Sequence, residues 1–427
     1  MRTFDYSDPG FETAFSAFAE ERRETPDEVD AAVREVLSAV RAEGIEAVLR
    51  FGREFDKVDL DETTLRVSPE DIEAGVAACS ADVKDAIAFA AERIRAYHER
   101  QRPRDESFTD DAGVQLGWRW TPIEAVGIYV PGGRAAYPST VLMNAIPAQV
   151  AGVDRIAMVT PPGKLQPAVL AAAKAAGVHE IWRVGGAQAV AALAYGAGAI
   201  RPVDKIVGPG NAFVTAAKRR VYGTVGIDAL AGPSEIVVVA DGANDPEWIA
   251  ADLLSQAEHD PAAQSILITD DPAFAARVEA AVRIQLDHLS TGVDAARSWR
   301  DHGAVIIAPL EAAPGLVDRL APEHVEFAVE APERLADQVR HAGAIFLGRH
   351  TPEAIGDYVA GSNHVLPTSR SARFSSGLSI YDFIKRTSIV KCDEAAFAIL
   401  GPPTVALAEA EGLPAHARSA AIRLGRG

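Results

Sequence analysis

The stretch LAPEHVEF places an acid and a base at adjacent positions, Glu323 and His324, inside a mostly apolar run. A carboxylate and an imidazole can each move a proton, so the pair could serve two steps of one reaction. The same residues also fit an ordinary helix start, with Pro322 in the first turn and Glu323 near the positive end of the helix dipole. Adjacent side chains of an extended strand point to opposite faces, so shared chemistry predicts a turn or a helix end at the mouth of a crevice.

Three further stretches pair a histidine with a second group that could bind a ligand, each at an expected break in regular structure. In LLSQAEHDP, Gln256 and His259 are three residues apart on a helix expected to end before Pro261, so both could face one centre. The other two stretches carry one acid and one histidine each: Asp357 with His364 in GDYVAGSNHVLPT, and Glu411 with His416 in EGLPAHAR. Glutamine is an unusual metal ligand, so this spacing alone is a weak indication of a metal site.

The first hundred residues are predicted to be mainly helical, after a short polar arm with several aromatic residues at 1–24. In TPDE, Thr25 can cap a helix, Pro26 suits its first position, and Glu28 completes a capping box. SPED, at Ser68–Asp71, repeats the device and opens a helical run expected to end near residues 101–103.

From about residue 120, short β-branched strands alternate with Ala-rich helices, which is typical of a parallel, doubly wound α/β unit. The strands of the first series are AVGIYVPGG, RIAMVTPPG, EIWRVGGAQ and DKIVGPGN, and those of the second are EIVVVADG, SILITDDP, AVIIAPL and AIFLG. The similar element order predicts an α/β fold with two related Rossmann-like domains. After SSGLSIYDF no further strand is expected, and the tail reads as helices separated by GPP and EGLP.

Five segments follow from these patterns. They are an N-terminal arm (1–24), a helical region expected to pack with the second α/β domain (25–118), the first α/β domain (119–235), the second α/β domain (236–383) and a helical tail (384–427). The tail has too little apolar surface for a core of its own, so it is expected to pack on another surface, such as that of a second subunit.

Four glycine-rich loops are expected at the carboxyl ends of strands: PGGRAAYPST, VGGAQ, VGPGNAFV and LAGPSE. Ligands of open parallel sheets collect at the carboxyl ends of strands, so these loops are candidates for binding a phosphate-bearing ligand. None contains the G-x-G-x-x-G fingerprint, because Phe213 stands where GPGNAF would need its third glycine. Tight turns alone remain an alternative explanation.

Composition predicts a cytoplasmic protein without a nucleic-acid or membrane partner. The chain has 42 basic and 60 acidic residues, a net charge of −18, which disfavours polyanionic surfaces. Two cysteines, Cys79 and Cys392, are too few for a disulfide framework. The N-terminus lacks the features of a signal peptide. The run AVAALAYGAGAI is shorter than the roughly 18 to 20 apolar residues that span a bilayer.

Nine motifs in series resemble the histidinol dehydrogenase family, and the resemblance runs from roughly residue 25 to 424. They are YVPGG, VGGAQAV, KIVGPGN, AGPSE, SQAEHDPAAQSILIT, LAPEHVE, GDYVAGSNHVLPT, ARFSSGLSIYDF and EGLPAHA. The resemblance implies an NAD-dependent, zinc-containing homodimer with shared active sites. Such an enzyme oxidises L-histidinol through L-histidinaldehyde to L-histidine, the last two steps of histidine biosynthesis, with two NAD and one water.

The resemblance also assigns residues. Zinc ligation falls on Gln256, His259 and Asp357 of one subunit and His416 of the other. Substrate contacts fall on Ser234, Gln256, His259, His324, Asp357, His364, Glu411 and His416. The NAD contacts fall on Tyr129, Gln188 and Asn211. The reaction requires a base to deprotonate the alcohol and a group to activate water. His324 is expected to be the base, and Glu323 is expected to activate the water.

Three alternatives stay open. A related zinc and NAD dehydrogenase could act on another alcohol, such as a sulfonated diol. A zinc hydrolase could use Glu323 to activate water for acyl transfer. A catalytically silent nucleotide- or metal-binding protein could keep the fold alone.

Overall fold

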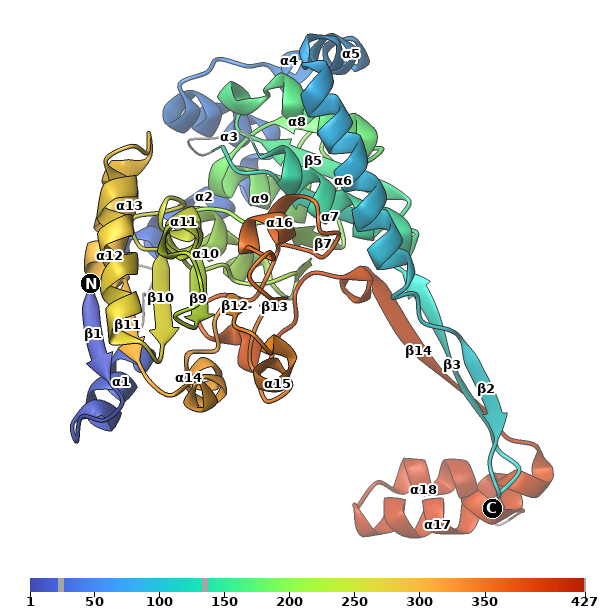
Figure 1. The fold of residues 1–427 in the computed structure, drawn as a ribbon. Helices are drawn as coiled ribbons and strands as arrows, with labels where there is room; N and C mark the ends of the chain where they lie inside the picture. The colour runs from blue at the N-terminus through green and yellow to red at the C-terminus, as the bar shows by residue number, and fades with distance from the viewer. Residues whose placement is uncertain (22–26, 133–136, 426–427) are drawn as a thin grey trace. The chain divides into compact units, whose positions relative to one another are not determined.

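The first α/β domain is built on a five-stranded sheet in which all strands are parallel, in the order β6-β5-β4-β7-β8. Figure 1 labels two of these strands, β5 and β7. Its strands are β4 (Ala125–Tyr129), β5 (Arg155–Thr160), β6 (Glu180–Arg183), β7 (Lys205–Val207) and β8 (Gly226–Ile227). The connecting helices are α7 (Pro138–Ala151), α8 (Pro167–Ala175), α9 (Gly186–Tyr195) and α10 (Ala212–Val221). Strand order reverses between β4 and β7, so α7 and α8 lie on one face and α9 and α10 on the other.

The second α/β domain has a six-stranded parallel sheet in the order β1-β11-β10-β9-β12-β13. Its strands are β1 (Arg2–Asp5), β9 (Glu235–Ala240), β10 (Gln264–Thr269), β11 (Ala304–Ile307), β12 (His324–Ala328) and β13 (Ala344–Leu347). Its helices are α1 (Phe11–Glu20), α11 (Pro246–Ala257), α12 (Pro272–Leu286), α13 (Gly292–His302), α14 (Ala313–Leu320), α15 (Pro332–Ala336) and α16 (Glu353–Tyr358). The two parallel sheets confirm the predicted α/β class.

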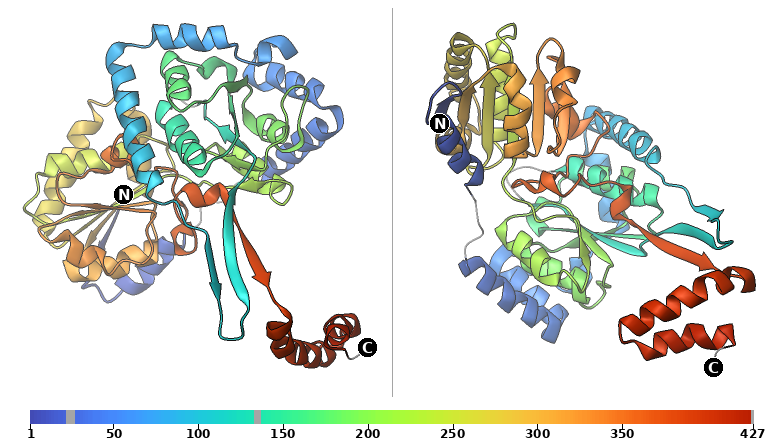
Figure 2. Two further views of the ribbon diagram at one scale, coloured as in Figure 1. Left: turned by 90° about the vertical axis from the view of Figure 1, so that its right-hand side faces the viewer. Right: turned by 90° about the horizontal axis from the view of Figure 1, so that it is seen from below.

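Alternate residues of the second sheet enter two separate cores, so helices cover both of its faces (Figure 2). Val237 and Val325 face the core that contains α1 and α14. Ile236, Val238 and Ala328 face the core that contains α11, α12 and α13. Because β12 pairs with β9 in register, the even-numbered residues of β12 point toward α11.

The N-terminal residues belong to the second domain, so the prediction of a polar arm at 1–24 was wrong. Strand β1 pairs with β11 at the edge of the sheet. The aromatic side chains of α1, Phe11, Phe15 and Phe18, are buried in the core with β11 and α14. Aromatic residues at every third or fourth position are the pattern of a helix with one buried face, so the sequence did contain a signal for this buried helix.

The helical region packs on the first sheet rather than on the second, contrary to expectation. Its helices are α2 (Asp27–Glu43), α3 (Ile45–Phe51), α4 (Glu62–Leu65), α5 (Pro69–Ala78) and α6 (Ala81–Glu99), with a π-helical turn at Gly52–Asp56. Helices α2 and α3 share a core with α9 and α10, and α5 and α6 contact α7 and α8. Ser68 caps α5 as predicted, accepting a hydrogen bond from Asp71 N at 3.0 Å. The long helical run is broken between α5 and α6.

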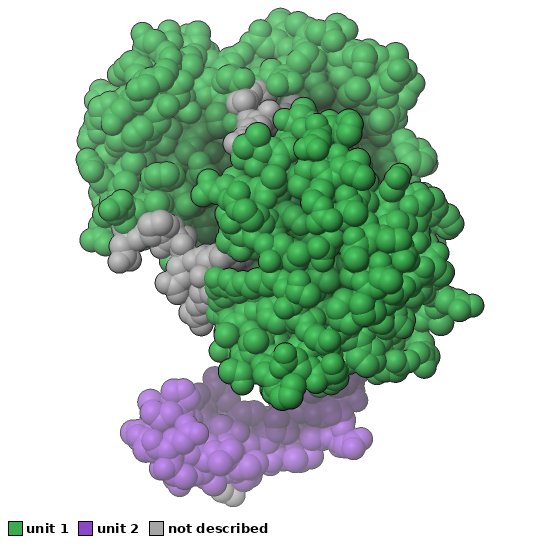
Figure 3. Space-filling view, turned by 60° about the vertical axis from the view of Figure 1, so that its left-hand side comes forward, with its two compact units in different colours: residues 1–100, 124–383 green, residues 101–123, 384–427 purple. Residues whose placement is uncertain are grey.

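The chain divides into two compact units, which Figure 3 colours separately: residues 1–100 with 124–383, and residues 101–123 with 384–427. The computed structural model describes residues 1–21, 27–132 and 137–425. The predicted capping residues Thr25 and Pro26, and part of the loop PGGRAAYPST, lie outside these ranges.

The second unit combines a three-stranded antiparallel sheet with a helical pair. Strand β3 (Gln115–Pro122) lies between β2 (Glu106–Thr109) and β14 (Ile384–Lys391). Strand β14 corrects the expectation that the tail contains helices only. Helices α17 (Glu394–Ala410) and α18 (Pro414–Ala421) are separated at EGLP as predicted, whereas Pro402 and Pro403 of GPP lie within α17.

Candidate active site

Glu323 and His324 lie at the amino end of β12, and both are buried. Helix α14 ends before them at Leu320, so the interpretation of this stretch as a helix start was wrong. Ala321 adopts a left-handed conformation, with φ of 47°, and turns the chain from the helix into the strand. The predicted turn is therefore present, and it leads into a strand.

Glu235, the first residue of β9, holds both side chains of the pair. Its N–H donates to Oε2 of Glu323 at 3.1 Å, and its carbonyl oxygen lies 3.0 Å from Nδ1 of His324. A carbonyl oxygen can only accept, so Nδ1 carries the imidazole hydrogen and donates it. The lone pair of His324 is then on Nε2, which has no hydrogen-bond partner within the described residues.

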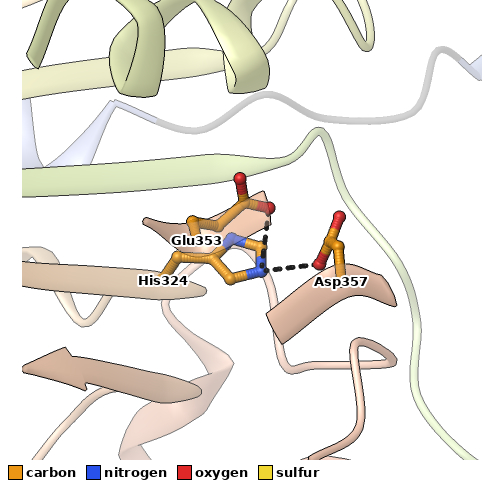
Figure 4. Close-up of side chains that lie close together, drawn as sticks. All are labelled: His324, Glu353 and Asp357. Carbon is orange, nitrogen blue, oxygen red and sulfur yellow. Dashed lines mark ion pairs between the residues drawn. The ribbon is translucent and has the colours of Figure 1, made fainter. Parts of the chain in front are cut away.

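Two carboxylates of α16 face this free nitrogen (Figure 4). Oε1 of Glu353 and Oδ1 of Asp357 each lie 3.8 Å from Nε2 of His324. One ligand atom from each of the three residues lies within 4.8 Å of the other two, so the cluster could hold a metal ion. Asp357 was predicted from the sequence and Glu353 was not, although their spacing of four residues on a helix was a usable signal.

Helix α11 supplies a further buried polar group, Gln256, near its carboxyl end. Neither atom of the Gln256 amide has a hydrogen-bond partner among the described residues. The helix ends at Ala257, earlier than the expected stop at Pro261, and His259 follows in a turn in which its N–H donates to Gln256 O at 3.2 Å. His259 is exposed, and its charge contributes to lowering the pKa of His324 and of His364, which indicates that it lies near both.

His364 also joins the cluster. Its Nδ1 donates to the backbone oxygen of Asp357 at 3.0 Å, and burial lowers its pKa to about 4. Ser234 immediately precedes Glu235, is half-buried, and its carbonyl oxygen accepts from Gln264 N at 2.9 Å. The loop LAGPSE thus lies at the amino end of β9, so this part of the site is at the opposite strand ends from those expected.

Burial determines the charge states of the acid–base pair. It lowers the pKa of His324 to about 3, so the imidazole is neutral at physiological pH. Burial, reinforced by Glu235, raises the pKa of Glu323 well above its usual range. For the two acids of α16, burial raises the pKa of Glu353 to about 8 and that of Asp357 to about 6.

A second pair of acids, the buried Glu326 and the half-buried Asp252, lies behind the cluster, on the α11 face of β12. Burial raises the pKa of Glu326, two residues after His324, to about 9, and that of Asp252, on α11, to about 6. Glu353 adds to both shifts through charge repulsion, and it accepts a hydrogen bond from Ser255 Oγ at 3.2 Å. This concentration of carboxylates is an environment that a bound cation would stabilise.

The three residues predicted to contact NAD lie at the carboxyl edge of the first sheet. Tyr129 ends β4, and its hydroxyl accepts from Gly186 N at 3.0 Å. Gln188, in the first turn of α9, is buried, and its Oε1 has no hydrogen-bond partner within the described residues. Asn211 caps α10, accepting from Phe213 N at 3.1 Å and Val214 N at 3.2 Å. The ends of β4 and β7, which carry Tyr129 and Asn211, flank the reversal of strand order, where ligands of open sheets bind, whereas Gln188 follows the edge strand β6.

Glu411 and His416 belong to the second unit, where both side chains are exposed. Glu411 follows the last residue of α17, and His416 lies in α18. Their assignment to the zinc and substrate site remains a prediction.

Two parallel sheets with a buried acid–base pair, beside a histidine and carboxylate cluster that could hold a metal ion, define an α/β enzyme. The sequence model of the histidinol dehydrogenase family matches residues 19–424. The histidinol dehydrogenase of Caulobacter vibrioides is 78% identical over 427 residues, which cover 100% of both chains. That of Mesorhizobium japonicum is 60% identical over 425 residues, 99% of each chain.

A solved structure agrees with these sequence matches. The crystal structure of histidinol dehydrogenase from Elizabethkingia anophelis superposes with a TM-score of 0.94 at 36% identity, covering 100% of this chain and 98% of the other. The chain belongs to the histidinol dehydrogenase family, whose members are oxidoreductases of histidine biosynthesis. Among the residues that the structure describes, no helix is both long and apolar enough to cross a membrane.

Proposed function

We propose that the protein catalyses the NAD-dependent, four-electron oxidation of L-histidinol through L-histidinaldehyde to L-histidine. Family membership supports the substrate and the pathway. The observation that carries the chemistry is the pair of contacts to Glu235, which hold the carboxyl group of Glu323 and Nδ1 of His324. They leave Nε2 of His324 as the imidazole nitrogen that can accept a proton.

In the first step, His324 accepts the hydroxyl proton of histidinol at Nε2 while hydride leaves the carbinol carbon for the nicotinamide. Burial keeps the imidazole neutral, and Nδ1 already donates its hydrogen to Glu235, so Nε2 is the atom that can take a proton. The products of this step are the aldehyde, NADH and one proton.

In the second step, Glu323 removes a proton from the water that adds to the aldehyde carbon. Burial raises the pKa of Glu323, and a carboxylate with a raised pKa is a stronger base when it is ionised. The hydrate then loses a second hydride to a second NAD, and the carboxylate of histidine forms. The two steps together consume one histidinol, two NAD and one water.

The proposal includes one zinc ion per subunit, held by Gln256, His259, Asp357 and His416 of the partner subunit. The buried Gln256 amide without a partner and the excess of buried carboxylates fit such a cation. A nitrogen and oxygen donor set suits Zn²⁺. When bound, the ion would orient histidinol through its imidazole and amino nitrogens.

The remaining substrate contacts are proposed for Ser234, His364 and Glu411, where the Glu411 carboxylate would face a cationic group. NAD is proposed to bind at Tyr129, Gln188 and Asn211. The apolar side chains exposed in the second unit support a homodimer in which this unit serves the partner's site: Phe108, Ile389, Val390, Ile399, Leu407, Leu413 and Ile422. A cytoplasmic location fits the two free cysteines, Cys79 and Cys392.

A substrate comparison tests the proposal against its alternatives. Purified zinc-loaded protein with NAD should reduce NAD with L-histidinol, and a chelator should abolish the reaction. Turnover of a sulfonated diol with no response to histidinol would favour the related dehydrogenase. Hydrolysis of an amide without NAD reduction would favour the zinc hydrolase.

A further inference from the structure

A buried ion pair lies next to the proposed NAD site. Lys218, on α10, contacts Oδ1 of Asp228, the residue that follows β8. Their side chains are only 3% and 5% exposed. Removing two charges from water is costly, and an apolar pair of similar volume is often at least as stable. This pair therefore calls for an explanation other than stability.

The pair holds both backbone polar groups of Gly208, the first residue after β7. Lys218 Nζ donates to the Gly208 carbonyl oxygen at 3.0 Å, and the Gly208 N–H donates to Asp228 Oδ2 at 2.8 Å. Asp228 Oδ1 also accepts from Ala229 N at 2.7 Å. The peptide groups on both sides of Gly208 are thereby fixed in orientation.

The backbone at Gly208 is unusual in two ways. Its φ of 105° is a conformation that only glycine adopts readily, and a Cβ there would lie 2.2 Å from the backbone oxygen of Tyr129. Gly208 therefore lies directly against the end of β4 at Tyr129, and it begins the loop that ends at Asn211. A shift at Gly208 would move two of the three proposed NAD contacts.

We propose that Lys218 and Asp228 are positioning residues for the dinucleotide. They hold Gly208 so that Tyr129 and Asn211 keep the spacing that NAD requires, and neither residue takes part in proton or hydride transfer. This inference rests on the proposed function, in which NAD binds at the carboxyl edge of the first sheet.

The same sheet offers a matched control at its opposite edge. Arg155 and Glu180 begin β5 and β6, and they form two hydrogen bonds, Nε to Oε2 at 2.8 Å and Nη2 to Oε1 at 2.9 Å. Their side chains are 14% and 16% exposed. This pair supports the sheet at its amino edge, away from the proposed NAD contacts.

The test compares Lys218→Met and Asp228→Asn with Arg155→Met and Glu180→Gln in the full-length, zinc-loaded enzyme. Dissociation constants for NAD and NADH, the KM of each substrate, kcat and the melting temperature are measured for every variant. We expect Lys218→Met to weaken NAD binding by about 10-fold or more, while the KM for histidinol changes by less than about 2-fold. Asp228→Asn keeps an acceptor for the Gly208 N–H, so it should weaken NAD binding less.

The control variants should lower the melting temperature while the NAD dissociation constant stays within about 2-fold of wild type. NAD affinity that falls equally in the Arg155→Met and Lys218→Met proteins would overturn the inference, because loss of stability alone would then explain it. Unchanged NAD affinity in both Lys218→Met and Asp228→Asn would also overturn it while leaving the proposed function intact. A wild-type enzyme that does not bind NAD would overturn both.

Discussion

Nδ1 of His324 lies 3.0 Å from the backbone oxygen of Glu235, on the adjacent strand of the second sheet. This contact fixes the tautomer and the orientation of the imidazole, and the N–H of the same Glu235 holds the carboxyl group of Glu323 at 3.1 Å. A single residue at the start of β9 thus positions both proposed proton-transfer groups. Substitutions at Glu323 and at His324 should separate the roles of the two groups.

Replacing Glu323 by glutamine should affect the second half-reaction selectively. The variant should still convert histidinol to the aldehyde, while oxidation of histidinaldehyde should fall by on the order of 10²-fold or more, because an amide cannot accept a proton from water. The two rates are measured separately, with histidinol and with histidinaldehyde as the starting substrate. Glu330→Gln, an exposed position in the same stretch, serves as the control. Equal losses in both half-reactions would remove the assignment of Glu323.

Replacing His324 by asparagine should slow the alcohol step by on the order of 10²-fold to 10⁴-fold. An asparagine amide can retain a donor toward the Glu235 carbonyl oxygen, whereas the proton acceptor at Nε2 is lost. The rate of the first hydride transfer is measured in a single turnover under excess NAD. A single-turnover rate equal to that of the wild type would show that another group accepts the hydroxyl proton.

The zinc content of variants distinguishes two sets of metal ligands that both include Asp357. The proposal predicts that His259→Asn and Gln256→Ala lose most of the zinc on dialysis, whereas Glu353→Gln retains it. The bound zinc per subunit is measured by atomic absorption, and affinity is measured by competition with a chelator. Zinc that is lost from Glu353→Gln and kept by His259→Asn would instead assign the ion to His324, Glu353 and Asp357, which lie close enough to share one.

The free energy of unfolding should depend on pH because the carboxyl group of Glu326 is buried. Burial raises its pKa in the folded protein from about 4.5 to about 9, so between these values the folded state binds more protons than the unfolded state. The stabilising contribution is therefore complete below about pH 4.5 and is lost as the pH rises toward 9, with a slope of at most about 1.4 kcal/mol per pH unit for one proton. Melting temperatures of wild type and Glu326→Gln across this range check the sign. A wild-type protein that gains stability relative to Glu326→Gln as the pH rises would contradict it.

If the tail of each subunit completes the active site of its partner, two inactive variants should restore activity when they form a mixed dimer. Homodimers of His416→Ala and of His259→Ala should each be inactive. After the two chains are unfolded and refolded together, about a quarter of the wild-type activity should return, because half of the dimers are mixed and each mixed dimer has one intact site. If His416 serves the site of its own chain, no mixed dimer has an intact site and no activity returns.

The alternation of strands and helices was predictable, because hydrophobic periodicity is a local signal. The strands β4–β7, β9–β11 and β13 lie in the runs that were predicted as strands, and Ser68 caps α5 as its motif indicates. Strands β8 and β12 were not predicted. The first strand was not predictable from Arg2–Asp5, because its partner β11 begins about three hundred residues later. Strand β14 was missed for a similar reason: its sequence is polar, and it is a strand because it pairs with β3.

Part of the site could also be predicted from the sequence. A turn at residues 322–324 was predicted from the demand that an adjacent acid and base share one site; a turn does precede β12, but His324 itself is the first residue of the strand. The buried acids Glu326 and Glu353 and the half-buried Asp252 were not predicted, because charged residues in helices and strands are ordinarily assigned to solvent. Only the register of β12 with β9 shows that Glu326 points toward α11 and not outward.

The stoichiometry of NADH formation tests the central claim most directly. With limiting L-histidinol, excess NAD and the zinc-loaded enzyme, the absorbance of NADH at the end of the reaction is divided by the histidinol consumed. Two NADH per histidinol, with histidine as the product, is the result that the four-electron reaction predicts. One NADH per histidinol with accumulation of the aldehyde, or no NADH at all, would contradict it.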